Sequence, residues 1–153
     1  MTNKYMYFIA NWKMYGNINS LNTLNKVIKF SKSKEINKGR IIYCPHFTLI
    51  SSFFKKFQNC LIDIGAQNCH ENDDYGPHTG FINSRMLKNI GANYVIIGHS
   101  ETREGNDNKK INLKIKSAIN KKLNVIFCIG EKLIDKKKME KLNQFYLNKL
   151  KKV

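Results

Sequence analysis

Polar side chains follow each of five short apolar runs in the sequence, at the points where strands would end. They are Asn11 and Lys13 after the first run, His46 after the second, Gln67 and Asn68 after the third, His99 and Glu101 after the fourth, and Glu131 after the fifth. In parallel α/β sheets, ligands bind at the carboxyl ends of the strands, so these groups are expected to converge on one rim. Imidazole, ammonium and carboxylate groups gathered there predict an active site.

The apolar runs themselves are nearly continuous and rich in β-branched or aromatic residues, which is typical of strands buried on both faces. They are Tyr5–Asn11, Ile41–Pro45, Leu61–Ala66, Tyr94–Gly98 and Val125–Ile129. Helical patterns lie between them. Strand and helix alternate five times, which predicts a parallel sheet with right-handed crossovers.

The helices are predicted from their caps and from apolar residues at helical spacing. Ser20 is expected to cap a first helix that carries Leu21 and Leu24, and Thr48 is expected to cap a short second helix. Gly91 is expected to end the third helix, because glycine readily adopts the left-handed backbone found there. This third helix is expected at Asn83–Asn89, and the two that follow are expected at Asn108–Lys121 and Lys132–Val153.

Length and composition set the broad class. A chain of 153 residues predicts one domain, 1–153, with no linker. No run approaches the roughly 18 apolar residues of a membrane span, and no secretory signal is recognised, so membrane insertion and secretion are not expected. Four cysteines without a C-x-x-C pair favour a reduced, cytoplasmic protein.

The net charge of +16 raises the possibility of nucleic-acid binding. Proteins that read bases favour arginine for bidentate contacts to guanine. Among 27 basic residues, the arginines are only Arg40, Arg85 and Arg103. Specific nucleic-acid binding is therefore not expected, although weak, salt-sensitive contact with polyanions is.

Four segments carry a specific resemblance when they are taken together and in order. They are Phe8–Met14 (FIANWKM), Gly65–Cys69 (GAQNC) with Thr79-Gly80 after it, Tyr94–Glu101 (YVIIGHSE) and Val125–Glu131 (VIFCIGE). The chain thereby resembles the triosephosphate isomerase family. The resemblance implies an α/β fold of the TIM (β/α)8-barrel class, in which only about five β/α units are present and the barrel is incomplete.

The resemblance also implies a reaction, the interconversion of dihydroxyacetone phosphate and glyceraldehyde 3-phosphate through an enediolate. His99 would be the neutral imidazole that polarises the carbonyl, placed where a helix starting at Ser100 disfavours a cation. Lys13 would be the cation for the enediolate and the phosphate, and Asn11 would bind substrate and orient Lys13. Glu101 would contact these residues rather than the substrate, and it would pair with Lys13.

Each of these residues has a simpler interpretation. His99 could be a buried core histidine whose ring nitrogens are hydrogen-bonded. Lys13 could be a solvated surface lysine, and Asn11 could cap the end of a strand. Glu101 could be an acid favoured by the start of a helix.

The resemblance further implies a cytoplasmic homodimer in glycolysis and gluconeogenesis, with no cofactor. The segment after the third strand would reach into a second subunit, so that Thr79 approaches the partner's Asn11 and the partner's Lys13. The family usually has an acid after Thr79-Gly80 and an arginine after Ser100-Glu101. Phe81 and Thr102 stand there instead, which predicts an interface that is locally more apolar.

Histidines and acids also gather in that segment and raise the possibility of a metal. They are His70, Glu71, Asp73, Asp74 and His78. Their spacing matches no zinc signature, so metal binding is not expected.

Three working parts of the family have no counterpart in these 153 residues: the glutamate base, the glycine-hinged lid and the loops that grip the phosphate. A base and a positioned phosphate each contribute orders of magnitude in rate, so we expect little or no activity from this chain alone. A truncated reading of a full-length gene is the favoured interpretation, and a separately encoded second part or a decayed gene product are alternatives. A non-catalytic α/β module that binds sugar phosphates also stays open.

Overall fold

The computed structural model describes residues 5–33, 36 and 38–130 of the chain. Five parallel strands form one sheet in the order β1-β2-β3-β4-β5, so each strand pairs with the next one along the chain. The strands are β1 (Met6–Asn11), β2 (Gly39–Cys44), β3 (Ile62–Ala66), β4 (Tyr94–Ile97) and β5 (Asn124–Phe127). Each coincides with one of the expected apolar runs, and the predicted parallel β/α sheet is confirmed.

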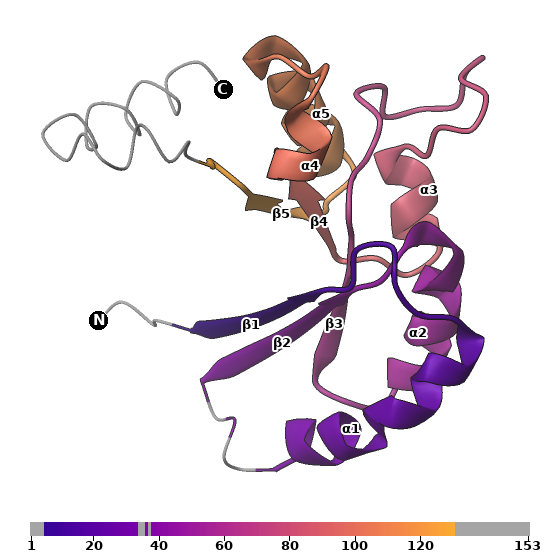
Figure 1. The fold of residues 1–153 in the computed structure, drawn as a ribbon, viewed down its shortest axis with the longest axis vertical. Helices are drawn as coiled ribbons and strands as arrows, with labels where there is room; N and C mark the ends of the chain where they lie inside the picture. The colour runs from indigo at the N-terminus through magenta and orange to yellow at the C-terminus, as the bar shows by residue number, and fades with distance from the viewer. Residues whose placement is uncertain (1–4, 34–35, 37, 131–153) are drawn as a thin grey trace, which may run out of the picture.

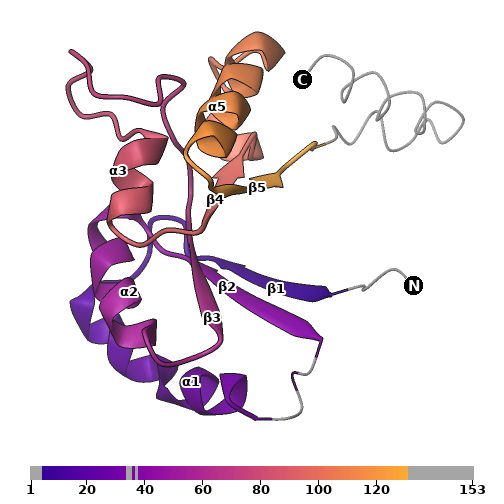
Figure 2. The ribbon, with the colours of Figure 1, turned by 180° about the vertical axis from the view of Figure 1, so that it is seen from behind.

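Helical segments connect the strands and lie along the convex side of a curled sheet (Figures 1 and 2). They are η1 (Ile18–Leu24), α1 (Asn25–Ser31), η3 (Phe47–Leu49), α2 (Ile50–Phe57), α3 (Ser84–Asn89), α4 (Ser100–Arg103) and α5 (Asn108–Asn120). In the part of the chain that the structure describes, none of these helices has the length and apolar character needed to cross a bilayer. The helix expected at Lys132–Val153, and Glu131 before it, lie outside the described residues.

Two of the predicted helix caps are wrong. The first helical segment begins after Asn17, whose side chain accepts from the backbone N–H of Asn19. Ser20 instead completes a capping box, because its hydroxyl accepts from the backbone N–H of Asn17 at 3.0 Å. The Thr48 hydroxyl lies 2.7 Å from Nδ1 of His46 and caps no helix. The other helix ends fit the sequence: Asn83 and Asp107 cap α3 and α5, and Gly91 follows α3 with a φ of +99°.

The main core fills the space between the sheet and the helices. Phe53 of α2 is fully buried, with its ring 5.0 Å from that of Trp12 and 5.5 Å from that of Phe57. A second, smaller cluster of Ile42, Cys44 and Ile96 lies apart from this core. Burying an aliphatic or aromatic side chain of this size stabilises a fold by about 1.5–3 kcal/mol, so the helical side carries most of the stability.

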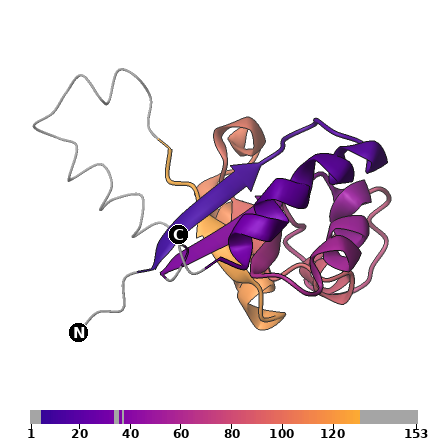
Figure 3. The same cartoon turned by 90° about the horizontal axis from the view of Figure 1, so that it is seen from below.

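The expectation that every strand is buried on both faces is wrong for the two outer strands, β1 and β5, whose residues are exposed or half-buried. Met6 is 63% exposed and Phe8 is 51% exposed, although β3 and β4 are buried along most of their length. Within the described residues β1 pairs only with β2, and the helices lie to one side of it (Figure 3). In the described part of the chain the sheet therefore has a free edge at β1 and an apolar surface beside it, as the incomplete barrel predicts.

Candidate active site

The turn after β1 holds Lys13 in a left-handed backbone conformation, with a φ of +52°. This conformation costs a non-glycine residue about 1–2 kcal/mol, so contacts must maintain it. The Asn11 side chain accepts from the backbone N–H of Lys13 at 2.9 Å. The Gln67 side chain donates to the carbonyl oxygens of Lys13, at 2.8 Å, and of Cys44, at 2.9 Å. The ends of β1, β2 and β3 are thereby tied together beneath the lysine.

The turn after β4 depends on a glycine and an arginine. Gly98 has a φ of +78°, and a Cβ there would lie 2.9 Å from the carbonyl oxygen of Cys128. The Arg103 guanidinium donates from Nε to the Gly98 oxygen at 2.7 Å and from Nη2 to the Cys128 oxygen at 2.9 Å. The sequence motifs indicate no role for Arg103. Its rarity in a lysine-rich chain is the one signal, because lysine lacks the planar group that donates two such hydrogen bonds.

This turn places His99 at the N-cap position of α4. A hydrogen bond there defines the tautomer of its ring. The backbone N–H of Glu101 donates to Nδ1 of His99 at 3.2 Å. The backbone N–H and the hydroxyl of Thr102 both donate to the His99 carbonyl, at 2.9 and 3.0 Å. Because Nδ1 accepts a hydrogen bond, the proton of a neutral ring sits on Nε2, which can donate to a ligand.

The turn after β1 and the turn after β4, hereafter the first and fourth turns, are joined by the Glu101 carboxylate. Nζ of Lys13 lies 2.7 Å from Oε1 of Glu101, and Nδ1 of His99 lies 3.5 Å from Oε2. The hydrogen bond from Lys13 holds the pKa of Glu101 below its usual value, and Glu101 raises the pKa of Lys13. The expected ion pair between Lys13 and Glu101 is present. The structure therefore brings an ammonium and an imidazole to one rim of the sheet, with a carboxylate between them.

Two other residues expected on this rim are held by contacts outside the Lys13, Glu101 and His99 group. Oδ1 of Asn68 accepts from Nζ of Lys114 at 3.2 Å, which directs the side chain toward α5. His46 donates from Nε2 to the Gly16 carbonyl at 3.1 Å, so it links the first two turns to each other. Both positions follow a strand, but hydrogen bonds to distant parts of the chain decide where their side chains point.

The acids after β3 pair with neighbouring cations. Glu71 lies 3.4 Å from Lys110, Asp73 lies 3.6 Å from Lys121, and Asp74 pairs with Arg85. Over the described residues, no three His, Cys, Asp or Glu side chains are grouped so that they could hold a metal ion. The four cysteines are free thiols. Burial raises the pKa of the Cys128 thiol, which lies beside Ile42, Cys44 and Ile96.

The sheet and the rim together define a class of protein. Parallel β/α units that curl into part of a barrel, with polar groups at the carboxyl ends of the strands, are the arrangement of (β/α)8-barrel enzymes. The family model described as triosephosphate isomerase matches residues 6–153. The chain belongs to the triosephosphate isomerase family.

Individual relatives agree with this family. The chain is 42% identical over 132 residues to a triosephosphate isomerase of Wolbachia sp. subsp. Brugia malayi. The matched segment covers 84% of this chain and 52% of that protein. It is 42% identical over 126 residues to one of Dictyoglomus thermophilum, which covers 80% and 49%. The crystal structure of triosephosphate isomerase from Bartonella henselae is similar with a TM-score of 0.86 at 33% identity, over 97% of this chain and 61% of that one. The chain spans about half the length of the curated relatives it matches.

Proposed function

We propose that this chain supplies the substrate-binding and electrophilic part of a triosephosphate isomerase active site. The reaction interconverts dihydroxyacetone phosphate and glyceraldehyde 3-phosphate through an enediolate. The observation that carries the proposal is the meeting of the first and fourth turns, where Nζ of Lys13 lies 2.7 Å from Glu101 and the Glu101 N–H fixes the tautomer of His99. Membership of the family supports the same reaction.

In this proposal each residue acts on a different part of the substrate. His99 donates from Nε2 to the substrate oxygen on which negative charge builds as the enediolate forms. Lys13 leaves Glu101 when substrate arrives, and its ammonium balances the phosphate and the enediolate charge. Asn11 keeps Lys13 in its left-handed turn through the 2.9 Å hydrogen bond and adds a donor for the substrate.

The 153-residue polypeptide does not complete this chemistry by itself in our proposal. A base must remove a carbon-bound proton, and Glu101, the carboxylate within the described rim, is already paired with Lys13. A correctly placed base contributes typically about 10²–10⁴-fold in rate. The isolated chain is therefore expected to bind triose phosphate weakly and to show little or no isomerase activity.

A chimera tests the function directly. Residues 1–130 are joined to the part of the Wolbachia relative that follows its matched segment, and isomerisation of glyceraldehyde 3-phosphate is measured. An active chimera whose activity falls at least about 10²-fold in His99→Gln and in Lys13→Met supports the proposal. Lys29→Met, at an exposed position on α1, is the matched control and should retain activity. A folded chimera whose activity is indifferent to His99 and Lys13 would refute it.

We further propose that the family's assembly applies here, as a cytoplasmic homodimer acting in glycolysis and gluconeogenesis. Thr79 and Phe81 support this, because both are exposed on the segment between β3 and α3. Sedimentation of the chimera would test it, with a dimer expected. A monomer at micromolar concentration would count against it.

A non-catalytic module that binds sugar phosphates is the second candidate. The pairing of Glu101 with Lys13 favours it, because the rim offers a cation and a donor but no free carboxylate among the described residues. This candidate predicts that the 153-residue chain binds glycerol 3-phosphate at least as well as the chimera does.

A further inference from the structure

Two histidine rings stack against each other in the segment between β3 and α3, hereafter the 70–82 loop. The ring centroids of His70 and His78 lie 4.5 Å apart, with an angle of 35° between their planes. The Phe81 ring meets His70 edge-on, with centroids 4.9 Å apart. The His70 side chain is only 10% exposed, while Phe81 is 62% exposed. The stack therefore links an inner residue of the loop to its outer surface.

One asparagine holds both rings. The backbone N–H of Asn72 donates to Nδ1 of His70 at 3.1 Å. The side-chain amide of Asn72 lies 2.7 Å from Nε2 of His78, and its Nδ2 can only donate. Each ring thus uses one nitrogen as an acceptor, which requires that nitrogen to be without a proton. A proton added to either nitrogen would face an N–H donor and break that hydrogen bond.

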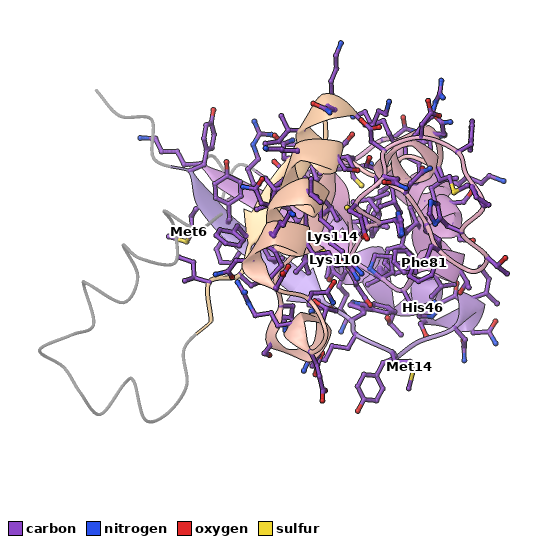
Figure 4. The ribbon with its side chains drawn as sticks, turned by 90° about the horizontal axis from the view of Figure 1, so that it is seen from above. Met6, Met14, His46, Phe81, Lys110 and Lys114 are labelled. Atoms are coloured by element: carbon purple, nitrogen blue, oxygen red, sulfur yellow. The ribbon has the colours of Figure 1, made fainter. Side chains whose placement is uncertain are left out.

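Charged groups face His70 from two elements. On the loop, Oε2 of Glu71 lies 3.8 Å from Nε2 of His70, and the His78 ring stacks on it. On α5, Lys110 and Lys114 occupy positions one turn apart, and Lys110 lies 3.4 Å from Oε1 of Glu71 (Figure 4). Burial lowers the pKa of His70, and His78 and the two lysines act in the same direction against the opposing effect of Glu71. The closed loop therefore favours the neutral ring more than solvent does.

We propose that the Asn72 bridge makes the 70–82 loop a pH-sensitive switch, closed when His70 is neutral and opened when His70 takes up a proton at Nδ1. Opening frees Asn72, unstacks His78 and moves the exposed Phe81.

The opening is local, because other contacts of the loop do not involve His70 or Asn72. Asp73 accepts from the Asn120 side chain at 3.2 Å and pairs with Lys121, and Asp74 pairs with Arg85. The backbone N–H of Tyr75 and the Arg85 guanidinium hold the pKa of Asp74 below its usual value. The middle of the loop therefore stays attached to α5 and α3 while the stack opens.

The direction of the pH effect follows from the lowered pKa. An unperturbed histidine titrates near 6.5, and the closed loop holds His70 below that value. Well above pH 6.5 both states are neutral and the closed loop has its full stability. As the pH falls below this value, the open loop takes up the proton first, and the closed state loses stability until the pH reaches the pKa of the closed form.

Hydrogen exchange and histidine NMR on the 153-residue chain test the switch. The protection factor of the Asn72 amide is measured from pH 7.5 to 5.0, together with the ring resonances of the four histidines. We expect protection at Asn72 to fall by about tenfold for each unit by which the closed-loop pKa of His70 lies below that of the open loop. The amide of Leu87, in the buried part of α3, should keep its protection.

Three variants separate the switch from a general effect of acid. His70→Asn keeps an acceptor near the place of Nδ1 but cannot take up a proton, so protection at Asn72 should stay high and independent of pH. His70→Ala should lose protection at every pH. His46→Asn, in a histidine that contacts Gly16 and Thr48 instead, should behave like the native chain.

The native chain and His70→Asn decide the outcome between them, whether or not His70→Ala folds. An equal fall in Asn72 protection in both chains overturns the proposal, because the loss would then not require His70. Constant protection in the native chain down to pH 5.0, while the His70 ring visibly titrates, overturns it as well.

Discussion

Arg103 and Gly98 are joined by a 2.7 Å hydrogen bond from the guanidinium Nε to the glycine carbonyl oxygen. The same guanidinium donates to the carbonyl of Cys128 at 2.9 Å, so one side chain connects the ends of β4 and β5. Because His99 follows Gly98 directly, this connection determines where the imidazole leaves the sheet.

Removal of the arginine should loosen that turn. Arg103→Met is expected to lower the free energy of unfolding by about 2–3 kcal/mol, since hydrogen bonds to a charged group contribute about 1.5–3 kcal/mol and two carbonyls lose their donor. Arg103→Lys should recover only part of this loss. Urea denaturation monitored by circular dichroism measures the change. Arg40→Met is the control, because Arg40 lies over the Tyr5 ring at the free edge; an equal loss there would contradict the role of Arg103.

Gly98 should tolerate no side chain. In Gly98→Ala the new Cβ would lie 2.9 Å from the Cys128 oxygen and 3.0 Å from Nη2 of Arg103, in a backbone conformation with a φ of +78°. Strain and overpacking together are expected to cost about 2–4 kcal/mol. Gly105→Ala is the matched control, since its φ is +73° and its Cβ would meet nothing within 4 Å. Equal losses in thermal unfolding at the two positions would mean that only the backbone conformation matters.

Much of the fold could be predicted from local patterns in the sequence. The five strands, the Asn83 start of α3 and the Gly91 stop each depend on a few neighbouring residues. The exposure of β1 could not be derived in this way, because Met6 and Phe8 have the same apolar character as residues of a buried strand. Burial depends on what packs against a strand, and the strand's own sequence does not contain that information.

The candidate site also contains features that the sequence predicts and features that it does not. Asn11, Lys13, His99 and Glu101 were identifiable as a set, and the structure brings them to one rim. The directions of His46 and Asn68 were not identifiable, because they depend on hydrogen bonds to Gly16 and Lys114, 30 and 46 residues away in sequence. Long-range contacts of this kind select among side-chain directions that local sequence leaves equivalent.

The ion pair at the rim predicts a change in the titration of Lys13. Glu101→Gln removes the charge that raises the pKa of Lys13, so this pKa should fall toward its ordinary value. Nζ-directed NMR of the lysines across pH 8–12 measures it. Glu104→Gln, an exposed carboxylate in the same segment, should leave Lys13 unaffected. An unchanged Lys13 titration in Glu101→Gln would show that the pair is not populated in solution.

The free edge at β1 predicts self-association through apolar side chains. Phe8→Lys places a charge on the exposed edge strand and should reduce light scattering at high protein concentration, because edge lysines oppose pairing between sheets. Thermal stability should change little, since Phe8 is already half-exposed. Leu61→Lys makes the same kind of substitution at a position that is 64% exposed and away from the edge. A similar fall in scattering there would point to net charge as the cause.

Phe81 and Thr102 predict a coupled effect on dimerisation of the completed chimera. Phe81→Glu and Thr102→Arg each place one charge where the interface is proposed to be apolar, and each should weaken the dimer by tenfold or more, since an unpaired buried charge costs several kcal/mol. The double variant should recover much of the loss, because the two charges would then pair. Dissociation constants from sedimentation give the coupling energy of this double-mutant cycle.

The reverse result is equally informative for the same pair. Additive effects in the cycle would mean that the two positions never meet across the interface. In the single chain Phe81 already contacts His70, and the Thr102 hydroxyl donates to the His99 carbonyl at 3.0 Å. Each single variant therefore needs its own activity and histidine spectra, so that a disturbed His99 is told apart from a weakened dimer. Loss of activity at concentrations where the dimer remains intact would assign the effect of Thr102→Arg to the active site.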